Sequence, residues 1–224
     1  MKIPLTKHGW REMLAATVVF GVLTAAAVMT FWPAAVLPAA AWLFVMAFFR
    51  DPPRRADEPD AFLAPADGKV VDVVPVGPES PLGAEGVRVG IFMGLFDVHV
   101  NRSPCQGAVS EITRHAGGFV DARRPAASET NESATILLAH SRGGRTFKVA
   151  VRQIAGIIAR RIVTDLRVGQ QVSTGQRIGM VKFGSRAELI LPRELVGEVA
   201  ARVGQTVRAG RTVLVRPPQQ ETPS

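Results

Sequence analysis

The longest uncharged stretch of the chain restricts its fold more than any other feature. Residues 13–49 contain no Asp, Glu, Lys or Arg, and as one helix they would be about 55 Å long. A bilayer core needs only about 20 residues. Pro33 and Pro38 interrupt the stretch near its middle, where proline disfavours a continuous helix. We therefore predict two apolar helices, at about 13–31 and 38–49, that form a membrane-anchoring hairpin.

Basic residues flank this hairpin at both ends: Lys2, Lys7 and Arg11 before it, and Arg50, Arg54 and Arg55 after it. Positively charged flanks stay on the cytoplasmic side, so we expect the inner membrane, with the rest of the chain on its cytoplasmic face. A signal peptide cleaved near Ala39–Ala41 is the alternative, but the apolar stretch is too long and carries a second apolar segment. The sequence leaves open whether the hairpin spans the bilayer or dips into one leaflet.

A linker rich in proline and charge follows the hairpin, so we place the anchor and linker at 1–56 and a β-rich domain at 57–224. Short β-branched runs separated by Gly and Pro fill that domain, as in all-β sandwiches and barrels. Arg167–Ile178 is also echoed by Arg202–Val213 in the form V-G-Q-x-V-x-x-G-x-x-(I/V). These features predict a mainly β, barrel-sandwich domain, like that of lipoyl and biotinyl carriers.

The composition and the motifs limit the classes of partner that this chain is expected to bind. The chain has 27 Lys and Arg against 19 Asp and Glu, a formal net charge of +8, which suits nucleic acid, anionic lipid or an acidic substrate. We expect no nucleic-acid partner, because neither an RNA-binding aromatic pattern nor a zinc-finger spacing is present. Cys105 is the only cysteine, so an internal disulfide is excluded, and we expect no metal site.

The Gly184–Ser185 pair stands between two apolar runs of the strand type. Such a pair usually forms a turn, because glycine reaches backbone angles that other residues avoid. The alternative is chemical: without a Cβ at residue 184, the Ser185 hydroxyl could attack the preceding carbonyl if acid–base groups lie nearby.

Two further residues are candidates for that acid–base chemistry. His99 ends an apolar run, and alternation places Asp97, His99 and Asn101 on the face opposite Phe96 and Val98. Histidine has the pKa of a base near neutrality. Asp67 precedes Gly68, where it either forms a turn or orients a histidine. Other polar candidates have weaker contexts: His115 in a loop, His140 at an expected exposed hairpin tip, and Asn131 and Glu132 at the start of a strand.

Five motifs in order resemble a known family: Phe48-Phe-Arg-Asp-Pro-Pro-Arg54, Pro65-Ala-Asp-Gly68, Phe92-Met-x-x-Phe-Asp-Val-His-Val-Asn-Arg-Ser-Pro104, Glu129-Thr-Asn-Glu132 and Phe183-Gly-Ser185. Together they are similar to the short, bacterial and archaeal type of phosphatidylserine decarboxylase. The resemblance runs from the anchor to about residue 192.

The resemblance implies a proenzyme that cuts itself between Gly184 and Ser185 into a large chain, 1–184, and a small chain, 185–224. Ser185 would be the nucleophile and the precursor of a covalent pyruvoyl cofactor, with no metal. That group would form a Schiff base with phosphatidylserine and take up the electrons left by departing CO2, giving phosphatidylethanolamine. The implied partners are this lipid, an anionic phospholipid membrane and the other half of the same proenzyme. Homo-oligomerisation is left open.

The resemblance also implies roles for other residues. His99 would be the acid–base group, with Asp67 in support. Longer bacterial members have Asp-Tyr-His-x-x-His here, and the second histidine is assigned to self-cleavage, but Arg102 stands at that position. Either His99 does both tasks, or His115 enters the site, or cleavage is assisted differently. The basic residues Arg102, Lys182 and Arg186 are candidates for holding the lipid phosphate.

Two alternatives to this function remain. A membrane-anchored barrel-sandwich adaptor without enzymatic activity would explain the anchor and the echoed segments, but not the combined motifs. A decarboxylase of another serine-headgroup lipid, such as the ether-linked archaetidylserine, would have the same reacting headgroup.

Overall fold

The computed structural model describes residues 4–157, 162–182 and 184–219. The chain divides into two compact units between Pro53 and Arg54. Two residues named above, Lys2 and Phe183, lie outside the described part. The boundary between the two units falls within the stretch of prolines and charged residues that was expected to be a linker.

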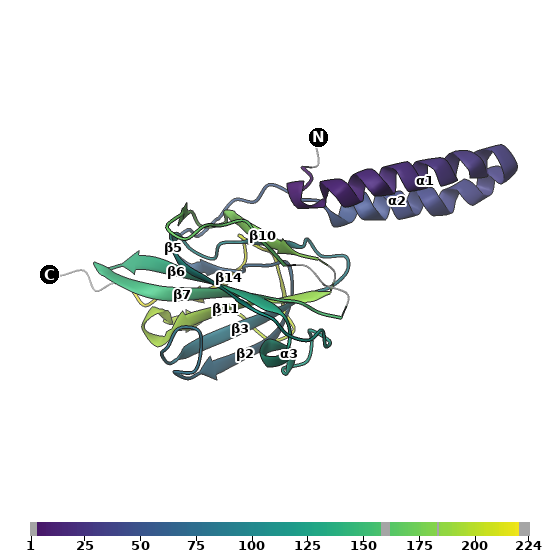
Figure 1. Ribbon diagram of the computed structural model, residues 1–224. Coiled ribbons are helices and arrows are strands. Elements are labelled where there is room, and N and C mark those ends of the chain that lie inside the picture. Colours follow the sequence, from purple (N-terminus) through teal and green to yellow (C-terminus); the bar gives the residue numbers. More distant parts are fainter. Residues whose placement is uncertain (1–3, 158–161, 183, 220–224) are drawn as a thin grey trace. The chain divides into compact units, whose positions relative to one another are not determined.

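The first unit is a pair of apolar helices that lie side by side (Figure 1). A short 3-10 turn, Lys7–Gly9, precedes α1 (Trp10–Phe31), and the 3-10 turn Trp32–Ala35 connects α1 to α2 (Val36–Phe48). Pro33 lies in that connection, and Pro38 lies in the first turn of α2, where proline costs no helical hydrogen bond. The prediction of two apolar helices joined near the prolines is therefore confirmed.

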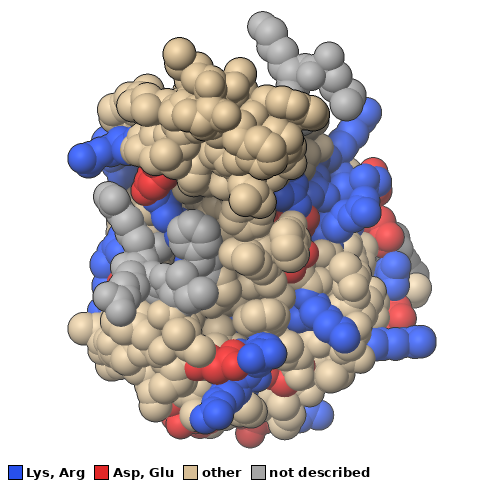
Figure 2. Space-filling view, turned by 90° about the vertical axis from the view of Figure 1, so that its right-hand side faces the viewer, with Lys and Arg blue, Asp and Glu red and all other residues tan. Residues whose placement is uncertain are grey.

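The surface of this hairpin suits a lipid environment. Figure 2 shows it almost wholly in tan, whereas charged residues are spread over the visible face of the second unit. The hydroxyls of Thr17, Thr24 and Thr30 each donate to the carbonyl four residues earlier, at 2.6 to 3.0 Å, so these polar groups are satisfied within the helix. By length and composition, the helical run 7–48 could cross a membrane. With 13 residues, α2 is about 20 Å long, shorter than a bilayer core.

The second unit is mainly β. Its elements are β1 (Phe62–Leu63), β2 (Gly68–Val76), β3 (Gly86–Met93), β4 (Val100–Arg102), β5 (Gly107–His115), α3 (Ala127–Thr130), β6 (Ser133–Arg142), β7 (Arg145–Ile154), β8 (Ile162–Thr164), β9 (Gln171–Val172), β10 (Arg177–Val181), β11 (Ser185–Pro192), the 3-10 turn Arg193–Leu195, β12 (Glu198–Val199), β13 (Thr206–Val207) and β14 (Val213–Arg216).

One large sheet carries most of these strands, in the order β13-β2-β3-β11-β7-β6-β5-β9, and its described pairs are antiparallel. It curls around the core (Figure 1). Two three-stranded sheets, β1-β14-β12 and β4-β10-β8, complete the unit. Buried aliphatic side chains from all three sheets form one main cluster. One of the two central strands of the large sheet, β11, is buried along its whole length.

The echoed segments form equivalent parts of this fold. The first contains β9 and the start of β10, and the second contains β13 and the start of β14. In the first segment Gly169 N donates to Val109 O at 2.8 Å, and in the second Gly204 N donates to Val70 O at 2.8 Å. Since the equivalent glycine of each segment makes the same bond to a strand of the large sheet, the echo reflects an internal structural repeat. The prediction of a mainly β barrel-sandwich is confirmed.

Candidate active site

Ser185 is the first residue of β11, where it pairs with Met93 at the end of β3. Its side chain is fully buried, with Oγ 4.0 Å from the Met93 sulfur. Gly184, directly before it, has a φ of 56°, in the left-handed region that glycine adopts without a Cβ clash. The Gly184–Ser185 bond therefore lies at the start of a buried central strand.

The carbonyl of Gly184 is held against a second glycine that the sequence analysis missed. A Cβ built on Gly156, two residues after the end of β7, would overlap the Gly184 carbonyl oxygen, and it would lie 3.3 Å from the Cβ of Ala122. Gly156 is buried. The carbonyl that Ser185 would attack thus packs against a surface that has room only for a hydrogen.

We expect Gly156→Ala to slow self-cleavage by roughly 100-fold, because displacing a reacting carbonyl by about 1 Å can cost that factor. The measurement is the rate at which the full chain gives two fragments on a denaturing gel. Gly118→Ala is the matched control, since a Cβ there meets Thr130 O at an ordinary 3.5 Å. Cleavage of Gly156→Ala at the control's rate would show that this contact is not needed.

His99 lies directly before β4 and is fully buried. Its Nδ1 is 2.9 Å from the carbonyl oxygen of Asp97, and because a carbonyl can only accept, the neutral ring carries its proton on Nδ1. Nε2 is then the basic nitrogen. The backbone N–H of Val181 donates to His99 O at 3.4 Å. His99 is therefore attached to the segment that leads into Ser185, with a defined tautomer.

The predicted alternation around His99 is wrong. Asp97 Oδ2 accepts from Gly94 N at 2.8 Å, which closes a turn in place of an extended strand. Phe96, expected to face the interior, is 77% exposed, whereas Val98, His99 and Asn101 are all buried. Because residues 94–97 form a turn, their side chains do not alternate between two faces as they would in a strand.

A buried polar chain, also missed, connects Asn101 to the sheet. Gln153 Nε2 donates to Asn101 Oδ1 at 2.8 Å, and Thr164 Oγ1 donates to Gln153 Oε1 at 3.0 Å. Asn101 Nδ2 in turn lies 3.6 Å from the Met93 sulfur, the atom that Ser185 also approaches. These residues fix the orientation of the Asn101 amide beside the candidate nucleophile.

Asp67 is buried and has two partners. Its Oδ2 accepts from Arg54 Nη2 at 2.7 Å, and its Oδ1 accepts from Ala209 N at 2.8 Å. Burial raises the pKa of Asp67, while the Ala209 N–H and the Arg54 guanidinium act in the opposite direction. The charge of Asp97 is close enough to contribute to this upward shift of the pKa. Asp67 is thus held by Arg54, a partner that sequence reasoning did not assign.

The supporting candidates divide into those near the site and those away from it. Asn131 Nδ2 donates to the carbonyls of Val120 and Ala155, both at 2.8 Å, so it fixes the segment that leads into Gly156. The carbonyl of Glu132 accepts from Ala155 N at 2.9 Å. His115 is exposed and lies three strands from β11 in the sheet, a separation of about 14 Å.

Arg102 and His140 are both buried in the fold. Arg102 Nη1 donates to Gly175 O at 3.0 Å, in the turn before β10. His140, expected at an exposed tip, is instead only 7% exposed, because its ring packs edge-on against Phe62 and its Nδ1 is 2.8 Å from Gln106 O.

Arg186, next to Ser185, lies in a buried charge cluster. Its Nη2 lies 2.5 Å from Asp72 Oδ2 and 2.8 Å from Glu188 Oε1. Ser128 of α3 donates to the same Glu188 oxygen at 2.5 Å. The side chains of Arg186 and Glu188 are fully buried, and Lys182 is also buried. The cluster thus anchors the start of β11 to β2 and α3.

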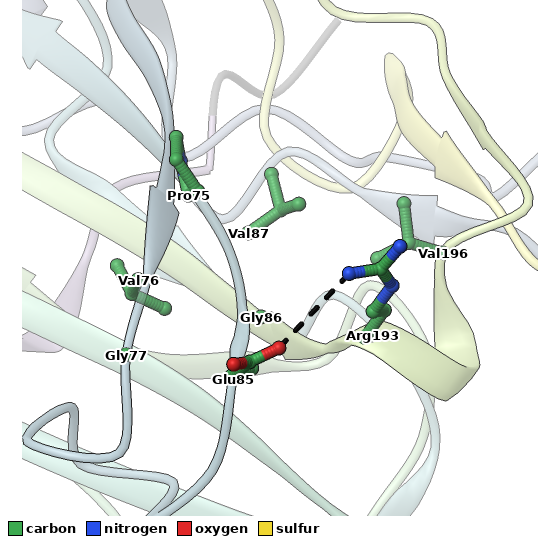
Figure 3. A pocket seen from close by; sticks show the side chains of 8 residues that line it. All are labelled: Pro75, Val76, Gly77, Glu85, Gly86, Val87, Arg193 and Val196. Carbon is green, nitrogen blue, oxygen red and sulfur yellow. Dashed lines mark ion pairs between the residues drawn. The ribbon is translucent and has the colours of Figure 1, made fainter.

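A groove of about 550 Å³ lies elsewhere in the β-unit (Figure 3). Glu85 and Arg193 form an exposed ion pair of 4.0 Å beside it. Gly86 pairs with Pro192 at this end of β3 and β11, whereas Met93 pairs with Ser185 at the other end, about 24 Å away. The groove is therefore remote from the candidate site. In the described ranges, no cluster of three or more His, Cys, Asp or Glu could hold a metal ion.

Comparisons with known proteins identify the family of this chain. The family model described as phosphatidylserine decarboxylase matches residues 42–215. Proteins called phosphatidylserine decarboxylase proenzyme are similar to this chain along most of its length. The one from Rhodopirellula baltica is 39% identical over 216 residues, covering 96% of this chain and 88% of that protein. The one from Carboxydothermus hydrogenoformans is 41% identical over 218 residues, covering 96% of this chain and 99% of that protein. The expected resemblance is confirmed, and this chain belongs to the phosphatidylserine decarboxylase family.

Proposed function

We propose that this chain is a proenzyme that cuts itself between Gly184 and Ser185 and then converts phosphatidylserine to phosphatidylethanolamine and CO2. One observation carries the proposal: in a member of this family, a fully buried serine begins a central strand directly after a glycine in the left-handed conformation. Family membership favours decarboxylation over the alternative of an anchored adaptor.

The cleavage uses atoms of the chain itself and one water molecule. Ser185 Oγ attacks the Gly184 carbonyl carbon, the C–N bond breaks, and the freed nitrogen takes the hydroxyl proton, so an ester replaces the amide. A base then removes the Cα proton of residue 185, and the Cβ–O bond breaks to release the Gly184 carboxylate. Water replaces the nitrogen of the resulting dehydroalanine, ammonia leaves, and residue 185 becomes a pyruvoyl group that caps residues 186–224.

The surroundings of Ser185 fit such a group. The position is buried between β3 and β7, so a ketone there would be shielded from bulk water. When present, a pyruvoyl group supplies a ketone that combines with the substrate amine and accepts the electrons left by CO2. His99 is the residue that we assign to proton transfer through Nε2, with Asp67 and Arg54 supporting the turn before it. Asn101 orients its amide toward the same space.

A direct test combines two measurements on the purified full-length protein in detergent. Phosphatidylserine should be converted with release of CO2, and the fragment 185–224 should have a blocked N-terminus and the mass expected for pyruvate at residue 185. An intact chain with an ordinary serine at that position would overturn the proposal. Comparing ester-linked and ether-linked serine lipids as substrates would distinguish phosphatidylserine from archaetidylserine.

We expect His99→Ala to lower the rate of lipid decarboxylation by about 10² to 10⁴, the range for loss of a general acid–base group. His140→Ala is the matched control, because His140 is also buried with Nδ1 against a backbone carbonyl. Near-normal CO2 release by a fully cleaved His99→Ala protein would remove His99 from the mechanism. The extent of cleavage in this variant also tells whether His99 is the base for self-cleavage.

We also propose that the hairpin anchors the chain in the inner membrane with the β-unit on the cytoplasmic face. The support is the basic residues on both flanks of the apolar stretch. In intact spheroplasts, a protease added outside should leave the β-unit uncut. Degradation of that unit before lysis would place it on the other side.

A further inference from the structure

Three loops at the end of the sheet that carries the Gly184–Ser185 bond have exposed apolar side chains. Phe96, in the loop after β3, is 77% exposed, and its neighbour Leu95 is 41% exposed. Phe119 and Val120, in the loop before α3, are 38% and 40% exposed, and Ile157, after β7, is 59% exposed. We call these five residues the apolar rim. Aliphatic and aromatic side chains so exposed on a folded domain mark an interaction surface when they occur together.

Hydrogen bonds and packing contacts place the three loops at one end of the large sheet. The loop that carries Phe96 begins after Met93, the partner of Ser185. Asn131 binds both Val120 and Ala155, which ties the second loop to the third. Gly156, next to Ile157, packs against the Gly184 carbonyl. The rim therefore lies at the end of the sheet that carries the bond that the chain is proposed to cut.

Basic side chains accompany the rim. Arg123 and Arg124 follow Val120 in the second loop and are exposed. The Arg123 guanidinium lies 5.9 Å from the ring centre of Phe92 and pairs with Asp121 at 2.6 Å. Exposed aromatic and aliphatic groups next to arginine are typical of segments that lie at the boundary between lipid headgroups and acyl chains.

We propose that the apolar rim inserts into the membrane interface, as a contact of the β-unit with lipid that is separate from the hairpin. This inference rests on the proposed function, because a diacyl substrate stays in the bilayer and its headgroup must reach residue 185. A rim that enters the interface at the same end of the sheet as this residue brings the reacting position to the level of the headgroup amine. The arginines then face anionic lipid phosphates.

The test attaches an environment-sensitive dye to Phe96→Cys in the full chain, reconstituted in vesicles of phosphatidylcholine and phosphatidylglycerol. Cys105 is the only native cysteine, and burial raises the pKa of its thiol to about 12, so it stays unlabelled. Val168→Cys is the control. Val168 is 64% exposed, and the turn that it begins is bonded to Val109, at the opposite end of the sheet from Ser185.

We expect a blue shift of the dye at residue 96 and severalfold stronger quenching by brominated lipid there than at residue 168, with Ile157→Cys behaving like Phe96→Cys. Equal, weak quenching at residues 96 and 168 would overturn the proposal. A blue shift without lipid quenching, together with disulfide crosslinks between two unlabelled copies of the Phe96→Cys protein, would identify a second chain as the occupant and also overturn it. The vesicles contain no phosphatidylserine and the readout needs no turnover, so failure of the proposed activity gives a separate result.

Discussion

Replacing Ser185 by alanine is expected to leave a single, uncut chain that releases no CO2 from phosphatidylserine. Alanine has no hydroxyl to attack the Gly184 carbonyl, and it has no oxygen to leave from Cβ, so neither the cleavage nor the ketone can form. The side chain at residue 185 is fully buried, and its oxygen has only a weak, 4.0 Å contact with the Met93 sulfur. We therefore expect the variant to fold and to unfold at nearly the wild-type temperature.

Ser103→Ala is the matched control for this experiment. Ser103 is equally buried, and its hydroxyl donates to the Cys105 carbonyl at 2.6 Å, so its loss tests the effect of removing a buried serine hydroxyl as such. The control should still give two fragments on a denaturing gel. Two fragments and CO2 release from Ser185→Ala would show that the bond is cut by a different nucleophile.

The sequence predicted the candidate reactive residues of this site better than it predicted the residues that surround them. Ser185, His99 and Asp67 could be named because their motifs occur in order along the chain. Gly156 could not, because its role depends on a contact with the Gly184 carbonyl that forms only when β7 and β11 pair. Arg54 was read as a membrane flank, since nothing local indicates that it reaches Asp67.

Local patterns predicted the fold where they matched its repeating units. The uncharged stretch with two prolines indicated the hairpin, and the echoed V-G-Q segments indicated the barrel-sandwich, because each signal lies within one supersecondary unit. Alternation failed at Phe96, where Gly94 and Asp97 close a turn. The exposed position expected for His140 was wrong because Phe62, distant in the sequence, packs on its ring.

Arg186 shows how a charge next to a reactive residue can be read in two ways. From the sequence, it was a candidate ligand for the lipid phosphate. In the structure its side chain is fully buried, and its guanidinium contacts the carboxylates of Asp72 and Glu188. A guanidinium enclosed by two carboxylates contributes to the fold by compensating their charge, and removing it would leave Glu188 buried without its closest cation.

We accordingly expect Arg186→Met to lower the free energy of unfolding by about 3–5 kcal/mol, the cost of removing one partner from a buried ion pair. For a chain of this size that corresponds to a fall in melting temperature of roughly 10 °C, measured in detergent on the uncut Ser185→Ala background. Arg193→Met is the control, since that side chain is 84% exposed and its 4.0 Å pair with Glu85 is worth at most about 1 kcal/mol. A second substitution, Glu188→Met, should restore part of the loss, because it removes the carboxylate that Arg186 compensates. An unchanged melting temperature, combined with a raised KM for the lipid in the cleavable Arg186→Met protein, would instead indicate that Arg186 binds the phosphate of the lipid substrate.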